Sequence, residues 1–302
     1  MRKFKYAGIN ISYLHRTCKE SIMKIKILSD STCDLSPELL SQHNISLVPL
    51  TVIKDGQAYS DGITITPQDI FNHVAAGGSL CSTAAINVGD YEDVFSKYVN
   101  DYDGVVHINI GSGFSSCHQN ACLAAQEFDN VVCIDSANLS AGQGLVVLKA
   151  CELAQSCESL AQLKEELDAF TPKVESSFLL DRLDYMVKGG RCSAAAALGA
   201  NLLNLKPCIE VRDGKMGVVK KYRGNYAKCL AAYVKDRICN RDDLSMDTLF
   251  ITRTPISSEC EAAVTEAVSQ SPKFGNTYWT VASCTVSCHC GPGTLGLLFV
   301  RK

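Results

Sequence analysis

Short apolar runs alternate with amphipathic segments along the first half of the chain. The runs that predict strands cover residues 25–28, 45–50, 105–110 and 131–134. Between them, apolar residues recur with the helical period of about 3.6 residues, over 91–100, 116–127, 144–154 and 160–170. Strands that alternate with helices are typical of stacked βα units and a largely parallel sheet. We therefore expect an α/β fold with a Rossmann-like N-terminal domain.

Two prolines mark helix starts in this half. Ser36 precedes Pro37, and Thr66 precedes Pro67. Each pair places a hydroxyl at the N-cap, where it accepts from a free backbone N–H, and a proline at the first helical position, where an N–H is not needed. We expect one helix after each pair, with Gly77-Gly78 ending the second helix.

The pattern changes after Thr171-Pro172-Lys173, which predicts a domain boundary. Beyond it, the runs 208–212 and 216–222 flank a hairpin signal, Asp213-Gly214-Lys215. Further strands are expected over 248–252, 277–282 and 295–300, and helices near 227–239 and 258–269. A chain of 302 residues exceeds what one core usually fills. We therefore expect an N-terminal extension at 1–22, an α/β domain at 23–172 and an α+β domain at 173–302.

Composition and charge exclude several partners. The net charge is −3 and charged residues make up 20% of the chain, so nucleic acid is not expected as a partner. No apolar run approaches the ~20 residues of a membrane span, and residues 1–22 are too polar for a signal peptide. We therefore expect no stable membrane insertion and a cytoplasmic location.

The chain has 16 cysteines, scattered through helix-like and strand-like segments. Without an export signal, this pattern predicts reduced thiols that act as small buried apolar groups. Cys288-His289-Cys290 does not suit a tetrahedral ion, because neighbours on an extended chain point to opposite faces. We expect neither a metal nor a cofactor.

The loop 111–116 follows a predicted strand and opens a helix. Backbone N–H groups at such a place bind anions, so Ser112, Gly113, Ser115 and Ser116 are candidate ligand contacts. The loop lacks the GxGxxG dinucleotide pattern and the Lys-Ser/Thr ending of a phosphate loop, which argues against a nucleotide. The alternative is a glycine turn with Ser115 as an ordinary N-cap.

Three further segments carry candidate chemistry. Thr83 lies among small residues between two predicted helices, where a ligand can approach the backbone. His289 stands in a sharp glycine-rich turn, where it either contacts a carboxylate or is a structural turn residue. A basic, glycine-rich stretch and two later cations form either a solvated loop region or a docking surface: Lys188, Arg191, Lys206 and Arg223.

Taken in order, these segments resemble the DegV family of bacterial fatty-acid-binding proteins, which includes the lipid-carrying subunit of fatty acid kinase. The resemblance covers residues 24–302, and the order and spacing of its motifs make it specific. The motifs are Asp30-Ser31-Thr32-Cys33-Asp34-Leu35, Thr83 with Gly89-Asp90-Tyr91, Ser112-Gly113-Phe114-Ser115, Asp135-Ser136 with Ser140 and Gly142, Leu183-Asp184-Tyr185 through Gly189-Gly190-Arg191, Asn204-Leu205-Lys206-Pro207, Arg223-Gly224, and His289-Cys290-Gly291-Pro292-Gly293.

The resemblance implies a long-chain, palmitate-like fatty acid in a buried tunnel at and beside the interface of the two domains. By motif matching, Thr83, Ser115 and His289 would hold its carboxylate. The family's known role implies a monomeric carrier without turnover of its own.

A carrier of this kind would present the carboxylate to a fatty acid kinase catalytic subunit for acyl phosphate formation, in the service of phospholipid synthesis. The four cations named above would then form part of a basic docking surface around the head-group opening, because positive charge guides the approach of a partner.

Two other functions fit parts of the pattern. Ser115 could be a hydrolase nucleophile with His289 as its base and Asp30 or Asp135 as the acid. Against this, the segment 113–117 lacks the G-x-S-x-G elbow. The glycine loop could instead bind a nucleotide or a phosphosugar, as in dihydroxyacetone-kinase-like folds.

Overall fold

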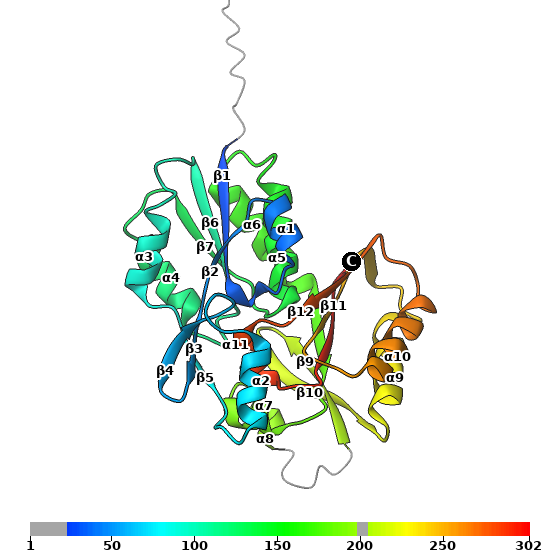
Figure 1. The fold of residues 1–302 in the computed structure, drawn as a ribbon. Helices are drawn as coiled ribbons and strands as arrows, with labels where there is room; N and C mark the ends of the chain where they lie inside the picture. Colours follow the sequence, from blue (N-terminus) through cyan, green and yellow to red (C-terminus); the bar gives the residue numbers. More distant parts are fainter. Residues whose placement is uncertain (1–22, 198–204) are drawn as a thin grey trace, which may run out of the picture.

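The described part of the chain forms three sheets, two built from its first half and one from its second half (Figure 1). The structure is a computed structural model that describes residues 23–197 and 205–302. The expected extension at 1–22 and Asn204 of the sequence motifs lie outside the described residues.

A four-stranded parallel sheet forms the centre of the first half. Its strands, in spatial order, are β2 (Ser46–Val48), β1 (Ile25–Asp30), β6 (Gly104–Asn109) and β7 (Val131–Asp135). All neighbouring pairs run parallel. Every residue of β6 is buried, as is typical of a parallel sheet with both faces covered. The expected Rossmann-like sheet is thereby confirmed.

Helices cover both faces of this sheet (Figure 1). α3 (Val88–Phe95) and α4 (Cys117–Ala125) pack on one face. α1 (Pro37–Gln42), α5 (Ala141–Leu153) and α6 (Leu160–Phe170) pack on the other. The periodic apolar positions of the sequence therefore become two separate cores, one on each side of the strands.

Both predicted proline helix starts are confirmed. The Leu39 N–H donates to the Ser36 hydroxyl at the start of α1. Thr66 begins α2 (Pro67–Ala75) with a capping box, in which it exchanges hydrogen bonds with Asp69. Gly77 follows the helix with a φ of +93°, a left-handed conformation that glycine adopts readily at a helix end.

A small antiparallel sheet adjoins the parallel one. It consists of β4 (Gln57–Ser60), β3 (Thr51–Lys54) and β5 (Ser82–Ala84). The strand predicted over 45–50 is confirmed only over Ser46–Val48, because Pro49 has no N–H to donate and the chain leaves the parallel sheet there. Thr83 lies on β5, a strand that the sequence pattern did not predict.

The second half forms a six-stranded mixed sheet. Its spatial order is β10 (Lys215–Arg223), β9 (Leu205–Arg212), β8 (Val174–Leu179), β13 (Leu295–Arg301), β11 (Leu244–Arg253) and β12 (Asn276–Val281). β11 and β12 run parallel, and the other neighbours run antiparallel, including the predicted β9–β10 hairpin. α9 (Tyr226–Ile238) and α10 (Ser258–Ser269) pack on one face, as expected for an α+β arrangement.

Helix α5 lies between the two large sheets. It contacts β1 and β6 on one side and β8 and β13 on the other. Val146 and Val147 of α5 belong to one buried core with Phe250 of β11 and Leu298 of β13. The division of the chain at residue 172 stays a prediction, and this helix joins the parts on either side of it.

Short helices complete the fold around the small sheet. α7 (Asp184–Gly189) contacts α11 (Cys284–Cys290), and α8 (Ser193–Ala196) contacts β10. Two 3-10 turns, at Ser31–Cys33 and Thr171–Lys173, follow β1 and α6. Among the described residues, no helix combines the length and the apolar character that crossing a membrane requires.

The N-terminal end of α11 is held by two buried carboxylates from the first half of the chain. The Cys284 N–H donates to Asp61 over 2.8 Å, and the Ser283 N–H donates to Asp34 over 2.8 Å. Carboxylates at this end of a helix satisfy free N–H groups and complement the helix dipole. His289 lies in the last turn of α11, so the expectation of a turn at this residue is wrong: the glycine-rich turn begins after Cys290.

Candidate functional site

A cavity lies where the three sheets meet. Its volume of about 190 Å³ is many times the ~10–15 Å³ that one water molecule needs. The wall is formed by β5, the loop after β6, the start of α5, α11 and strands of the six-stranded sheet. Its apolar side chains include Ile110, Phe114, Leu139, Phe178, Met186 and Leu298. An apolar wall with a few polar groups is typical of a small-molecule site.

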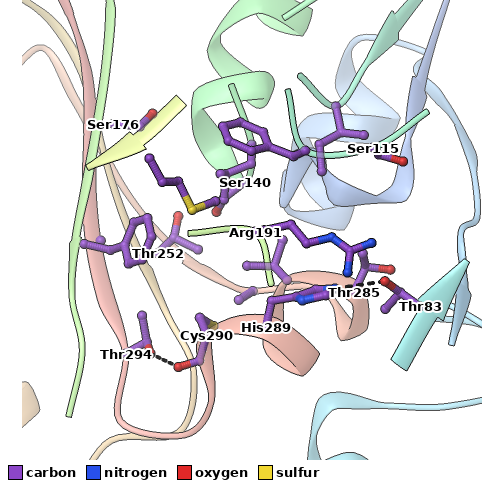
Figure 2. A pocket seen from close by; sticks show the side chains of 18 of the residues that line it. Thr83, Ser115, Ser140, Ser176, Arg191, Thr252, Thr285, His289, Cys290 and Thr294 are labelled. Atoms are coloured by element: carbon purple, nitrogen blue, oxygen red, sulfur yellow. Dashed lines mark hydrogen bonds between the residues drawn. The ribbon is translucent and has the colours of Figure 1, made fainter. Parts of the chain in front are cut away.

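Thr83 and His289 lie next to each other on the wall of this cavity. Thr83 Oγ1 and His289 Nε2 are 2.9 Å apart, a hydrogen bond between β5 and the last turn of α11. Figure 2 shows this bond and the Arg191 side chain close to it. The fold therefore brings together two of the three residues predicted to hold a carboxylate.

The His289 imidazole is largely buried. Burial, and to a lesser extent the positive charge of Arg191, lowers the pKa of His289 to about 4. The ring is therefore neutral at pH 7, with one nitrogen donating and the other accepting. Gly189 passes so close that a Cβ at position 189 would lie under 3.0 Å from His289 Nδ1.

Ser115 lines the same cavity just before α4. The Cys117 N–H donates to Ser115 Oγ over 3.3 Å, and this oxygen lies 3.1 Å from Cys117 Sγ. The alternative to a ligand contact at Ser115 is an ordinary N-cap. This alternative is wrong, because the N-cap of α4 is the next residue, Ser116. Thr83, Ser115 and His289 thus share one cavity wall, and their contact with a carboxylate stays a prediction.

Three buried polar atoms on the cavity wall have no hydrogen-bond partner among the described residues: Ser176 Oγ, Thr285 Oγ1 and His289 Nδ1. Buried polar groups are nearly always paired, so these atoms indicate places for polar atoms of a ligand or for water. The sequence reasoning missed Thr285 and Ser176. Thr285 stands four residues before His289, a spacing that puts both on one helix face, but the segment was not recognised as helical.

Ser140, at the start of α5, links the cavity wall to the anchor of α11. Its φ of 56° and ψ of −150° lie in a region that residues other than glycine rarely occupy. Its hydroxyl donates to the buried Asp34 over 2.6 Å, and Asp34 also holds the Ser283 N–H. Burial raises the pKa of Asp34 to about 7, against the opposing effect of these two hydrogen bonds.

The predicted supporting residues of the glycine loop take different positions. Ser116 lines the cavity, whereas Ser112 and Gly113 lie beside it. The Ser112 hydroxyl and N–H both donate to Asp135, over 2.5 and 3.0 Å. A Cβ at Gly113 would overlap the Gly214 carbonyl of the β9–β10 hairpin, so only glycine fits this close approach. Ser112 and Gly113 therefore hold the loop in place.

The four candidate docking cations also differ in their surroundings. Lys188 and Arg223 are exposed. Lys206 is paired with Asp181, with Nζ and Oδ1 2.6 Å apart. Arg191 lines the cavity, so its charge acts on the site and not only on the surface. Their contact with a partner stays a prediction.

The hydrolase alternative requires a serine, a histidine and an acid in hydrogen-bonded sequence. His289 Nε2 bonds to Thr83 and not to Ser115. Asp30 and Asp135 have other partners, on Tyr91 and on the glycine loop. Within residues 23–197 and 205–302, no acid therefore orients His289, whose Nδ1 has no partner there.

The described cysteines are all free thiols, and most are buried. Over the same residues, no group of three or more His, Cys, Asp or Glu side chains could hold a metal ion. The neighbours Cys288 and Cys290 lie on α11 on either side of His289, whose Nε2 is engaged by Thr83.

Sequence comparisons identify the relatives of this chain. The family model described as "Uncharacterised protein, DegV family" matches residues 24–302. A DegV domain-containing protein of Clostridium acetobutylicum is 32% identical over 290 residues, which cover 92% of this chain and 99% of the relative. One from Clostridium perfringens is 30% identical over 290 residues, with the same coverage of 92% and 99%.

Solved structures of similar proteins agree with these matches. A DegV family protein from Thermus thermophilus, described by its fatty acid binding, has a TM-score of 0.81 and 27% identity, covering 93% of this chain and 100% of its own. A stearic acid-binding protein from Eubacterium ventriosum has a TM-score of 0.77 and 27% identity, with coverage of 92% and 98%. The chain described here therefore belongs to the DegV family.

Proposed function

We propose that this protein binds one long-chain fatty acid in the cavity between its sheets, with the carboxylate at Thr83, Ser115 and His289. The observation that carries the proposal is a largely apolar wall on which buried polar atoms of α11 have no hydrogen-bond partner in the described part of the chain. The fatty acid binding described for the similar proteins of Thermus thermophilus and Eubacterium ventriosum supports this class of ligand.

The Thr83–His289 pair offers a donor to a carboxylate in either protonation arrangement. If the Thr83 hydroxyl donates to Nε2, the hydrogen of the neutral ring is on Nδ1, for which the described residues supply no partner. If Nε2–H donates to Thr83 instead, the threonine hydroxyl keeps its own hydrogen for the ligand. Thr285, one turn earlier on α11, supplies a further free hydroxyl.

The tail and the carboxylate of the fatty acid make opposite contributions to the free energy of binding. Burial of the tail is favourable by about 0.8 kcal/mol per methylene, or about 11 kcal/mol for the fourteen methylenes of a palmitate-like acid. Burial of an unpaired carboxylate is unfavourable by several kcal/mol. Hydrogen bonds from neutral donors and the positive charge of Arg191 offset that penalty. The neutral donors leave the carboxylate oxygens reactive toward a phosphoryl donor.

The proposal includes a partner. The protein acts as a cytoplasmic, monomeric carrier that presents the carboxylate to a fatty acid kinase catalytic subunit, which forms the acyl phosphate. The exposed cations Lys188 and Arg223 and the cavity residue Arg191 are available to attract negatively charged groups of a partner. Lys206 contributes less free charge, because Asp181 neutralises it.

Mass spectrometry of the small molecules released from the denatured full chain tests the ligand. We expect one fatty acid per chain in the wild type. Thr83→Val and Ser115→Ala should each weaken lipid retention about 10- to 100-fold, since hydrogen bonds to a charged group contribute about 1.5–3 kcal/mol. Thr265→Val and Ser269→Ala on the exposed face of α10 are matched controls. Unchanged lipid content in both cavity variants, or a nucleotide in place of lipid, would contradict the proposal.

Acyl phosphate formation in the presence of ATP and a catalytic subunit tests the partner. Lys188→Glu and Arg223→Glu should reduce product formation while lipid content stays constant. Arg191→Glu should reduce both, because Arg191 lines the cavity. Full product formation with both surface variants would exclude the docking role of these cations.

A further inference from the structure

A cysteine and a histidine form a contact on α4, outside the cavity wall. His118 and Cys122 are four residues apart and therefore share one helix face. Cys122 Sγ lies 3.5 Å from His118 Nε2, and His118 Nδ1 lies 3.3 Å from Asn109 Oδ1. The Asn109 amide nitrogen donates to the Asp30 carboxylate over 3.3 Å, which fixes the amide orientation. Its oxygen therefore accepts from His118 Nδ1–H, and His118 Nε2 is directed at the sulfur.

A second thiol lies beneath this pair. Cys133 is a buried residue of β7, the edge strand on which α4 packs. Its thiol interacts with the Cys122 sulfur. This interaction and burial raise the pKa of Cys133. Cys122 also packs against the hydrophobic cluster that contains Cys133.

The surrounding groups favour the thiolate form of Cys122. The hydrogen bonds from Cys133 and His118 lower the pKa of Cys122 to about 5, with a smaller contribution from the charge of Lys164 on α6. The hydrogen bond to Cys122, and more weakly the charge of Asp135 on β7, raises the pKa of His118. The lowered pKa of Cys122 and the raised pKa of His118 both favour an imidazolium–thiolate pair, as in reactive cysteines that lie next to a histidine.

The pair is also accessible, since Cys122 and His118 are only partly buried whereas Cys133 is covered. We propose that Cys122 is a redox-active thiolate that a hydroperoxide oxidises and that Cys133 resolves by forming a reversible Cys122–Cys133 disulfide. A partly accessible, histidine-paired thiol with a second thiol nearby is typical of such sites.

The two steps balance as follows. The Cys122 thiolate attacks the terminal oxygen of a hydroperoxide, an S–O bond forms, the O–O bond breaks, and the leaving alkoxide takes the proton of the His118 imidazolium. The sulfur of Cys133 then attacks the sulfenic acid sulfur as its proton passes to the departing hydroxyl: an S–S bond forms, the S–O bond breaks, and water leaves. The two sulfur atoms lose two electrons in total, which the hydroperoxide gains.

Alkylation of the reduced full chain with iodoacetamide, read by peptide mass spectrometry, tests the thiolate. Cys239 is the internal control, because it is also partly buried but its sulfur lies 3.2 Å from the Ser271 hydroxyl and not beside a histidine. At pH 6, Cys122 should react at least about tenfold faster than Cys239. His118→Gln should slow Cys122 and leave Cys239 unchanged. Equal rates at the two cysteines would overturn the proposal.

Equimolar hydrogen peroxide tests the second step. The wild type should yield a Cys122–Cys133 linked peptide that dithiothreitol reverses. Cys133→Ser should instead accumulate a sulfenic acid at Cys122, captured by dimedone, and Cys122→Ser should give neither product. Circular dichroism checks the fold of each variant. A wild type without the linked peptide, together with a Cys133→Ser variant without sulfenic acid, would exclude the site whether or not the protein binds lipid.

Discussion

Gly189 lies against the edge of the His289 imidazole, where a Cβ would overlap Nδ1. Its φ is not in the left-handed region, so the requirement for glycine at this position is purely steric. The last residue of α7 thereby sets how far the imidazole can turn away from Thr83.

Gly189→Ala should therefore displace the His289 ring and weaken lipid retention about tenfold or more, the effect of about 1.4 kcal/mol from one lost hydrogen bond to a charged group. The measurement is bound fatty acid per chain after purification. Gly217→Ala is the matched control, since a Cβ there meets nothing within 4 Å and its φ is also not positive. Equal losses in the two variants would point to a general effect of the substitution.

His289→Gln should change how the stability of the chain depends on pH under acidic conditions. The pKa of His289 is lowered to about 4 in the folded chain, so its contribution to stability is full above its ordinary pKa of about 6.5 and is lost as the pH falls through 4. As the pH falls from 6.5 to 4, the wild type should lose about 3 kcal/mol of its free energy of unfolding because of this residue. The variant should not show this loss. Urea unfolding at several pH values measures the difference, with His43→Gln at the end of α1 as the control.

Asp34→Asn should have the opposite effect on the pH profile. The pKa of Asp34 is raised to about 7, so its contribution to stability is full below its ordinary value of 3.8 and is lost as the pH rises through 7. Asparagine still accepts from the Ser283 N–H and does not ionise. When the pH rises from 4 to 8, the free energy of unfolding of the variant should therefore fall by up to about 4 kcal/mol less than that of the wild type.

In the wild type these two dependences overlap and partly cancel. Between pH 4 and 7, the free energy of unfolding should fall with rising pH in His289→Gln, where only the Asp34 effect remains. It should rise with pH in Asp34→Asn, where only the His289 effect remains. Asp129→Asn, at an exposed carboxylate, is the control. Parallel curves for wild type, His289→Gln and Asp34→Asn would contradict the assignment of both groups.

Thr285→Val should separate ligand binding from stability. The Thr285 hydroxyl is buried and has no partner within residues 23–197 and 205–302, so its replacement by a methyl group should leave the lipid-free chain as stable or slightly more stable. Retention of lipid should nevertheless fall about tenfold if this hydroxyl contacts the carboxylate. Thermal unfolding of delipidated protein and lipid quantification give the two values. A loss of stability with unchanged lipid content would assign Thr285 a structural role.

The sequence pattern predicted the parallel sheet and most helices, because their apolar periods are long and their starts carry caps such as Ser36 and Thr66. It failed where elements are short. β5 has three residues, and α11 has seven residues of which most are polar or cysteine, so neither shows a period. Both elements depend on tertiary contacts, such as the hydrogen bonds from α11 to Asp61.

The candidate site could be predicted only as separate segments. Motif resemblance pointed to Thr83 and His289, but nothing local in the sequence indicates that they are hydrogen-bonded across 206 positions. Arg191 is exposed, as expected of a surface cation, and nothing local in the sequence indicates that it also lines the cavity. Ser176 and Thr285 became visible only as buried atoms without partners.

The position of α5 between the two large sheets makes the halves of the chain mutually dependent. A fragment that ends at residue 172 would leave Val146 and its neighbours without the cover of Phe250 and Leu298. Such a piece should associate or precipitate when expressed alone, and the intact chain should melt in one cooperative step. The boundary at Pro172 would then separate an α/β part from an α+β part of the chain, although the two parts fold together as one unit.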